Sequence, residues 1–208
     1  MNANDSAVEE LRRLSTSVEG LSCIVSDALG RTGAMHSEVR AMWSGARLVG
    51  SARTAKPHGN DVSAVFSAIE RARPGDVIVI EGCGGGPVAF WGENATLLAL
   101  RRGLVGTVMG APCRDVQAHI RLSYPVFSVG ATPAGGTFGQ RGEVDVPVSV
   151  GGIVATPGDV LVADENGVTV VPGAQLDAVV AAIPDLLRKE REIQDDIAAG
   201  HGLSRRRP

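Results

Sequence analysis

Hydrophobic positions recur along the chain in two patterns, and the change between them falls near residue 125. Before it, apolar stripes at helical spacing alternate with short apolar runs, which is typical of helices that alternate with buried strands. After it, short apolar segments lie between turns, until helical periodicity returns. The predicted helices are residues 7–14, 24–29, 62–72, 91–102, a short segment from residue 115, and about 174–199; the predicted strands are residues 46–55, 77–80, 105–109, 125–129, 144–150, 160–163 and 168–171.

This order of elements predicts an α/β fold in which helices cover a mixed sheet. Asn166-Gly167 predicts a tight hairpin between the last two strands. The tetrapeptide Pro-Gly-Asp-Val occurs at residues 74–77 and at 157–160, which we interpret as one strand-entry turn used twice. A length of 208 residues suits a single domain, residues 1–208, with a core at about 22–173 and the long helix after it.

Composition and charge argue against several classes of protein. The net charge is −3, so nothing indicates nucleic-acid binding, which favours a basic face. Residues 1–15 lack the pattern of a signal peptide, and no apolar run has transmembrane length. Cys23, Cys83 and Cys113 are odd in number and widely spaced, which argues against a disulfide framework or a zinc site. We therefore expect a cytoplasmic protein with neither a membrane nor a nucleic-acid partner.

Side chains suited to catalysis lie in two short segments that each follow a predicted strand. Glu93 belongs to the segment Trp91-Gly92-Glu93-Asn94, and Arg114-Asp115 follows Cys113. Loops after strands form ligand crevices in open α/β sheets. The carboxylates suit magnesium or manganese, Arg114 matches a carboxylate, and the amides that open a helix at residues 92–95 suit an anion. Such a set could hold a small 2-oxo acid, with its keto oxygen on a metal that stabilises an enolate.

Two structural interpretations of these residues stay open. Glu93 would favour a helix N-terminus electrostatically whether or not it binds a metal. Arg114 and Asp115 could form an ordinary ion pair at the surface.

The pairs Gly92-Glu93 and Arg114-Asp115, with twenty residues between them, resemble the signature of the RraA-like family. That family includes 4-hydroxy-4-methyl-2-oxoglutarate aldolases, which also decarboxylate oxaloacetate, and the regulator of ribonuclease E activity. The likeness covers roughly residues 22–200, through further segments in the same order: Val25–Leu29, Gly50–Thr54, Pro74–Val77, Pro125–Phe127 and Pro157–Val168.

The resemblance implies a swivelling β/β/α domain, with N-terminal helices and a long C-terminal helix added in this chain. It implies assembly as a homotrimer, or as a hexamer made of two trimers, with sites between subunits. It also implies a divalent metal, magnesium or manganese, bound directly by Asp115 and through water by Glu93. The implied activity is that of a class II pyruvate aldolase with oxaloacetate decarboxylase activity, acting through a pyruvate enolate.

The resemblance further implies how a small 2-oxo acid would bind. Arg114 would bind the substrate and help to stabilise the enolate. The backbone of Gly92, Glu93, Asn94 and Ala95 would hold the pyruvyl carboxylate.

The sequence departs from the family pattern near the arginine. Met109 stands where the family usually has an acidic residue, and the following loop contains Pro112 and Cys113. In the aldolases an acidic residue of a neighbouring subunit approaches the metal, and Glu190 and Glu192 are the candidates here. These departures leave the substrate open.

The lysine inventory bears on the type of aldolase. The chain has only Lys56 and Lys189, and neither lies in a segment that we expect to be buried. A Schiff-base aldolase needs a lysine desolvated in a pocket. An aldolase built on this sequence is therefore expected to use a metal.

Two other functions fit parts of the sequence. A non-catalytic regulator that binds a ribonuclease or another protein would share the fold, although the intact Glu93, Arg114 and Asp115 favour an enzyme. The predicted strand at residues 77–80 and the glycine-rich segment Gly82–Gly86 after it together resemble the first motif of an S-adenosylmethionine-dependent methyltransferase. The next strand, however, ends at Met109 without the acidic residue that would hold the ribose.

Other side chains near the candidate site are interpreted structurally. Trp91 is expected to pack as a core anchor or lid, and Asp61 to cap the helix that follows it. Cys113 has no histidine partner in its motif and is expected to be an ordinary buried thiol. His119, one helical turn after Asp115, is expected on a helix surface.

Overall fold

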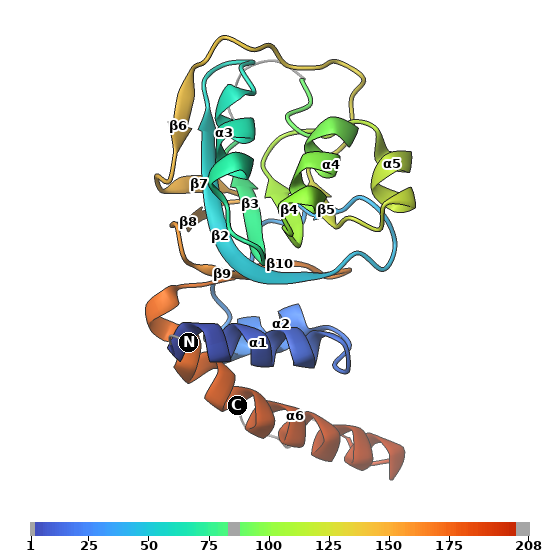
Figure 1. The fold of residues 1–208 in the computed structure, drawn as a ribbon. Helices are drawn as coiled ribbons and strands as arrows, with labels where there is room; N and C mark the ends of the chain where they lie inside the picture. The colour runs from blue at the N-terminus through green and yellow to red at the C-terminus, as the bar shows by residue number, and fades with distance from the viewer. Residues whose placement is uncertain (1–2, 83–87, 203–208) are drawn as a thin grey trace.

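The computed structural model describes residues 3–82 and 88–202, and it has a mixed α/β architecture (Figure 1). Most of the glycine-rich segment considered as a methyltransferase motif, including Cys83, lies outside the described residues. The helices are α1 (Ala3–Ser15), α2 (Leu21–Ala28), α3 (Ser63–Arg71), α4 (Glu93–Arg101), α5 (Val116–Arg121), a 3-10 turn η1 (Gly173–Gln175) and α6 (Leu176–Ala198). The strands are β1 (Arg40–Ala41), β2 (Leu48–Pro57), β3 (Asp76–Ile80), β4 (Gly106–Met109), β5 (Val126–Ser128), β6 (Gly142–Val144), β7 (Val148–Val150), β8 (Ile153–Ala155), β9 (Val160–Asp164) and β10 (Gly167–Val171).

One mixed sheet carries most of the strands, in the order β1-β5-β4-β3-β2-β9-β10, with β6 paired to β2 beside this path. Strands β2 to β5 are paired in parallel, whereas β1, β6, β9 and β10 are antiparallel to their neighbours. The two ends of the order, β1 and β10, contact each other, so the sheet is nearly closed. β7 and β8 form a separate hairpin.

Alternation along the central strands divides the apolar side chains between the two faces of the sheet. In β3, Val77 and Val79 belong to a cluster inside the curled sheet, which the β7–β8 hairpin completes. Ile78 and Ile80 belong to a second cluster on the opposite face, under α3 and α4. Successive side chains of a strand point to opposite faces, which explains why this strand is apolar throughout.

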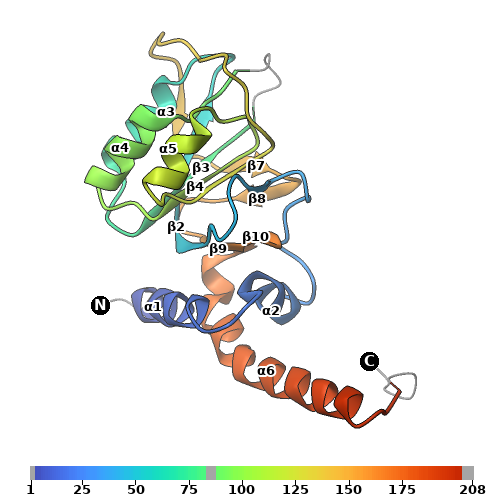
Figure 2. The same cartoon turned by 90° about the vertical axis from the view of Figure 1, so that its right-hand side faces the viewer.

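Two groups of helices lie on different sides of the sheet (Figures 1 and 2). α3, α4 and α5 cover one face, and α1, α2 and the start of α6 pack together against β2, β9 and β10. Leu176, Val179 and Ile183 bury the first half of α6, and its second half, with Glu190 and Glu192, extends away from the domain (Figure 2). None of the helices within the described ranges is long and apolar enough to span a bilayer.

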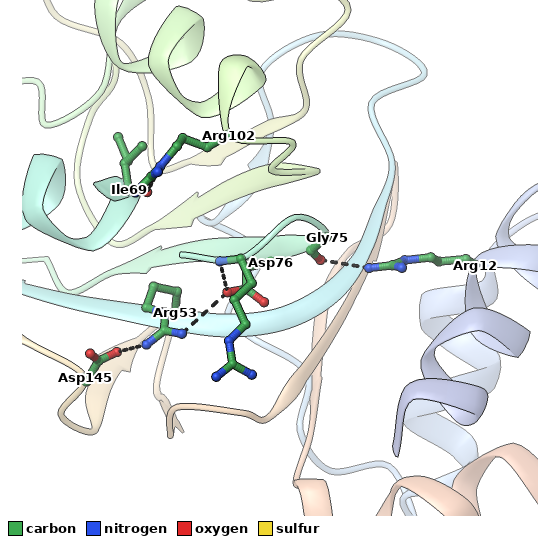
Figure 3. A network of polar contacts seen from close by, with 8 residues as sticks. Arg12, Arg53, Ile69, Gly75, Asp76, Arg102 and Asp145 are labelled. Atoms are coloured by element: carbon green, nitrogen blue, oxygen red, sulfur yellow. Dashed lines mark hydrogen bonds and ion pairs between the residues drawn. The ribbon is translucent and has the colours of Figure 1, made fainter. Parts of the chain in front are cut away.

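Two arginines, Arg12 and Arg53, bind the turn that leads into β3 (Figure 3). Arg12 of α1 donates to the Gly75 carbonyl oxygen at 2.8 Å. Arg53 of β2 contacts Asp145 at 2.6 Å and Asp76 at 3.7 Å. Arg12 thus links α1 to the start of β3, and Arg53 links the residue after β6 to the same end of β3.

The repeated Pro-Gly-Asp-Val segment is a repeated turn, as predicted. Gly75 and Gly158 have φ of +89° and +91°, a conformation that favours glycine. Asp76 and Asp159 each accept a hydrogen bond at 2.8 Å from the backbone N–H three residues before them. The turns lead into β3 and β9, which both pair with Ser51 of β2. The two turns therefore lie on opposite sides of Ser51.

The strand predicted at residues 144–150 is wrong as a single element. It is interrupted at residues 145–147, where Asp145 has φ of +63° and Pro147 lacks an N–H. β6 before the break pairs with β2, whereas β7 after it pairs with β8. The hairpin at residues 164–167 is present, with Asp164 opposite Gly167.

Candidate active site

The two segments singled out in the sequence lie side by side beyond the carboxyl ends of β3 and β4. Trp91 and Cys113 form a parallel backbone bridge, and the Arg114 N–H donates to the Trp91 carbonyl oxygen at 2.8 Å. This pairing places Glu93 at the start of α4 next to Asp115, which precedes α5. The predicted residues therefore lie close together because the segments after β3 and β4 form one further parallel backbone bridge.

Asp115 is fixed by the backbone of the other segment. Its Oδ2 accepts a hydrogen bond from the Glu93 N–H at 2.9 Å. Asp115 has φ of +56°, a left-handed conformation that aspartate adopts more readily than most residues. Such conformations persist where the surrounding structure holds them, and they cluster at functional sites.

Arg114 lies against two glycines that leave room for its side chain. Its Nε is 3.6 Å from Asp115 Oδ2, and both side chains are about half exposed. A Cβ on Gly92 would lie 2.6 Å from Asp115 Oδ2, and a Cβ on Gly135 would lie 2.6 Å from Arg114 Nη1. A Cβ at Gly92 or Gly135 would therefore displace the aspartate or the arginine side chain from this arrangement.

Glu93 forms an ion pair with Arg121 of α5. Sequence reasoning missed this arginine, because its partner is 28 residues away and α5 is too short to show a periodic pattern. Both side chains are partly exposed, so the pair can exchange with solvent or with an ion.

The two carboxylates of the site determine which cation it could hold. Among residues 3–82 and 88–202, no group of three or more His, Cys, Asp and Glu side chains is placed to hold a metal. Glu93 and Asp115 supply one carboxylate each from residues whose backbone and side chain are in contact, with 42% and 40% of their side chains exposed. Magnesium is commonly held by one or two carboxylates and keeps several waters, so these residues fit magnesium or manganese, with the remaining positions left to water and substrate.

A buried polar layer lies behind these residues. Trp91 Nε1 donates to Thr96 Oγ1 at 2.8 Å, and Thr96 Oγ1 is 3.1 Å from His119 Nδ1. His119 is fully buried, so the prediction of a surface histidine was wrong. Burial lowers the pKa of His119, although the Arg114 carbonyl and the nearby carboxylates oppose this effect. Trp91 is a core anchor, stacked on Tyr124 at 5.8 Å.

The unusual residues of the arginine loop are accommodated in the core. Cys113 is fully buried, and burial raises the pKa of its thiol to about 11. A thiol with this pKa is protonated at neutral pH and is a poor nucleophile. Met109 is also fully buried, where an acidic side chain would need a partner.

A small pocket of about 100 Å³ opens beside Arg114. One end is formed by Arg114 and by Gly92, Asn94 and Ala95 at the start of α4, and the rest is mostly apolar. Asp115 lies on the other side of Arg114, in a second pocket with Thr132 and Pro133. Gly92, Asn94, Ala95 and Arg114, four of the residues predicted to bind substrate, line the first pocket, whereas Glu93 is not among its described lining residues. Asp115 lines the second pocket.

Neither lysine has the environment of a Schiff-base residue. Lys56 Nζ is 3.6 Å from Glu81 Oε1, and 44% of the lysine side chain is exposed. Lys189 is exposed on α6. Both lysines therefore lack the desolvation that would make their amines nucleophilic at neutral pH.

The close approach of two backbone segments explains one glycine of the segment considered for nucleotide binding. A Cβ on Gly82 would overlap the carbonyl oxygen of Gly110, so the ends of β3 and β4 require a glycine there. β4 ends in buried Met109, and no carboxylate stands at that position.

The chain was compared with known proteins. A model of the RraA-like family, described as Aldolase/RraA, matches residues 22–170. A protein of Halalkalibacterium halodurans that bears the name "Putative 4-hydroxy-4-methyl-2-oxoglutarate aldolase" is 35% identical over 179 residues, which are 84% of this chain and 85% of that protein.

Two solved structures are similar over most of their length. Streptomyces coelicolor RraAS2, described as an unusual member of the RNase ES inhibitor RraA protein family, is 28% identical with a TM-score of 0.76, covering 91% of this chain and 96% of that one. A Geobacillus kaustophilus protein described as an S-adenosylmethionine: 2-dimethylmenaquinone methyltransferase is 25% identical with a TM-score of 0.67, covering 74% of this chain and 94% of that one.

Proposed function

The chain belongs to the RraA-like family, and we propose that it is a carbon–carbon lyase of the class II pyruvate aldolase type, dependent on magnesium or manganese and also able to decarboxylate oxaloacetate. The observation that carries the proposal is the contact between the two candidate segments: the Asp115 carboxylate accepts the Glu93 N–H, and Arg114 lies beside both. Arg114 and the start of α4 line one small pocket, and Asp115 lines a second pocket that shares Arg114 with the first.

Each residue has a role in the proposed reaction. Arg114 would bind the carboxylate of the 2-oxo acid through its planar guanidinium. The Glu93 N–H is used by Asp115, whereas no described residue accepts a hydrogen bond from the amides of Asn94 and Ala95. Those two amides, in the first turn of α4, would bind the same carboxylate.

The metal would be bound by Asp115 directly and by Glu93 through water. It would supply the positive charge that stabilises the enolate left when the carbon–carbon bond breaks. The surroundings of Lys56 and Lys189 support this route over a Schiff base.

We propose that the enzyme is a homotrimer or a hexamer, with a cytoplasmic location remaining a prediction. Leu97, Leu100 and Ile120 are large apolar side chains that are 40–47% exposed on neighbouring helices α4 and α5, which favours an interface on this face. The second half of α6, which contains Glu190 and Glu192, lies away from α4 and α5 of its own chain (Figure 2). These two glutamates could approach only the site of another subunit.

A non-catalytic regulator is the second candidate function. The similarity to RraAS2 favours it, because that protein belongs to a family of ribonuclease inhibitors by its description. A regulator of this kind would act without a divalent metal and would tolerate the loss of Asp115. A methyltransferase is less well supported, because β4 ends at Met109 and not at the acidic residue that would hold the ribose of the cofactor.

The proposal is tested by pyruvate release from oxaloacetate and from 4-hydroxy-4-methyl-2-oxoglutarate, with magnesium, with manganese and with a chelator. We expect metal-dependent turnover that the Asp115→Ala variant loses by a factor of about 10² or more, as for other residues that stabilise developing charge. Asp27→Ala, which removes a half-exposed carboxylate paired with Arg31, is the matched control and should retain activity. Turnover of neither substrate above the metal-only background, together with no binding of pyruvate, would favour the regulator.

A further inference from the structure

The pocket beside Arg114 has one charged end and one apolar wall. Arg114, Asn94 and Ala95 form the end at which an acid would bind. The same pocket is also lined by Val62 and Phe66 of the α3 region and by Phe138 of the β5–β6 loop, which form its apolar wall. An acid held at the charged end would therefore direct its other half along aromatic and aliphatic side chains.

The wall is a built part of the fold. The rings of Phe66 and Phe138 are 5.3 Å apart. The Val62 N–H donates to the Thr137 carbonyl oxygen at 2.9 Å, and the Thr137 N–H donates to the Asn60 carbonyl oxygen at 2.8 Å. These bonds fix the backbone on both sides of the ring pair.

Asp61 strengthens the attachment of the same loop. Its Oδ1 accepts the Ser63 N–H at 2.9 Å at the start of α3, as predicted for a capping residue, and its Oδ2 accepts the Arg141 N–H at 3.1 Å. The chain is therefore held to residues 60–62 on both sides of Phe138. Yet 71% of Phe138 is exposed, and a large aromatic side chain in this position is a common feature of ligand sites.

Among the described residues, the pocket offers no second cation to a second carboxylate. Arg114 is the only cation among its described lining residues, and the proposed function already assigns it to the first carboxylate. Arg121 pairs with Glu93, and Arg141 lies 3.8 Å from the buried carboxylate of Asp61. A charge placed in apolar surroundings without a partner loses its hydration and gains nothing in return.

We infer that the preferred substrate is a 2-oxo acid whose second half is apolar, such as a 4-hydroxy-2-oxo acid with an alkyl group at C4, and that dicarboxylates such as oxaloacetate are weaker substrates of the same site. The inference rests on the proposed function. In the retro-aldol step, the C4 hydroxyl loses its proton and the C3–C4 bond breaks. Its electron pair stays on C3 as the pyruvate enolate, C4 becomes the carbonyl of an aliphatic aldehyde or ketone, and the enolate takes up a proton at C3.

The test compares ligands of similar shape and different charge. Binding of 2-oxoglutarate and of 5-methyl-2-oxohexanoate, in which an isopropyl group replaces the distal carboxylate, is measured by calorimetry on the magnesium-loaded protein, with pyruvate as the reference. We expect the branched acid to bind at least about tenfold more tightly than 2-oxoglutarate, a typical ratio for a matched apolar pocket. Equal or tighter binding of 2-oxoglutarate, with pyruvate still bound, would overturn the inference and leave the lyase standing. Failure of all three acids to bind would overturn the proposed function with it.

Variants of the wall locate the effect. Phe138→Ala should weaken binding of 5-methyl-2-oxohexanoate by a factor of about 5 to 10 and leave pyruvate binding unchanged. Phe138→Arg should reverse the preference in favour of 2-oxoglutarate. Val154→Ala, which shortens an apolar side chain of β8 that is 61% exposed, is the control and should change neither. If Phe138→Ala dissociates the oligomer while the affinities stay the same, the wall serves assembly and the inference is wrong.

Discussion

The Glu93 backbone N–H donates to Asp115 Oδ2 at 2.9 Å, across 22 residues of sequence. The hydrogen bond connects the first residue of α4 to the residue that precedes α5. The two carboxylates proposed to hold the metal are therefore positioned by one unit, made of two helix starts, and not by two independent loops. Functional groups on such supported elements keep their geometry more closely than groups on free loops.

Gly92→Ala tests this arrangement with a single methyl group. Gly92 has φ of −156°, extended backbone that alanine also adopts, so the change acts mainly through the Cβ, which would lie 2.6 Å from Asp115 Oδ2. We expect the folded protein to lose turnover by a factor of about 10², measured as kcat/KM for pyruvate release. In the Asp115→Ala background the same change should cost little more. A full effect in both backgrounds would show that the methyl group acts elsewhere.

Asp164 is predicted to be a major contributor to stability. This buried carboxylate accepts hydrogen bonds from Ser22 N–H at 2.9 Å, Ser22 Oγ at 2.7 Å and Asn166 N–H at 2.9 Å, so it joins α2 to the β9–β10 hairpin. Asp164→Ala leaves these donors without an acceptor and should lower the free energy of unfolding by about 2–4 kcal/mol in urea titrations. Glu165→Ala, at the exposed neighbouring position, should change it by less than about 0.5 kcal/mol.

His119 predicts a pH dependence of stability. Its pKa in the folded protein lies below the ordinary value of 6.5 because of burial. Below pH 6.5 the unfolded chain binds a proton that the folded protein does not, so stability present above pH 6.5 is lost as the pH falls. Urea unfolding at pH 7.5 and 5.5 measures the free energy of unfolding of the wild type and of His119→Asn. The wild type should exceed the variant by less at pH 5.5 than at pH 7.5. A difference independent of pH would contradict burial of a neutral imidazole.

Cys113 should be unreactive in the native protein. With a buried thiol whose pKa is about 11, we expect no alkylation by iodoacetamide at pH 8 on a time scale that labels denatured protein completely. Peptide mass spectrometry before and after addition of urea checks this for Cys113 by itself. Rapid labelling of the native protein, accompanied by loss of turnover, would reopen a catalytic role for the thiol.

Much of the fold could be predicted because its helices and central strands carry strong periodicity. β3 is a run of four β-branched residues after a Pro-Gly-Asp turn, and both signals are local. β1 has only two residues and pairs with β5, far away in the sequence, so it leaves no periodic signal. β8 has three residues and pairs with β7 across Gly151-Gly152, a local turn signal that could have predicted this hairpin. The break between β6 and β7 could have been predicted from Pro147, which cannot donate within a sheet.

The candidate site divides in the same way. Glu93, Arg114 and Asp115 could be selected because chemically suited residues followed predicted strands. The Glu93–Arg121 ion pair, the burial of His119 and the Phe66–Phe138 wall depend on how α3, α4, α5 and the β5–β6 loop pack together. Such contacts join residues far apart in the sequence, and no pattern within one segment contains them.

The most direct test of the central claim is exchange of the methyl protons of pyruvate in D₂O, followed by proton NMR. Enolate formation does not depend on the unknown half of the substrate, so exchange isolates the step that Asp115, Glu93 and Arg114 are proposed to support. We predict exchange that requires magnesium, exceeds the rate with magnesium alone, and is lost with chelator or in Asp115→Ala. Exchange no faster than that of magnesium alone, or equal in wild type and Asp115→Ala, would contradict a pyruvate lyase at this site.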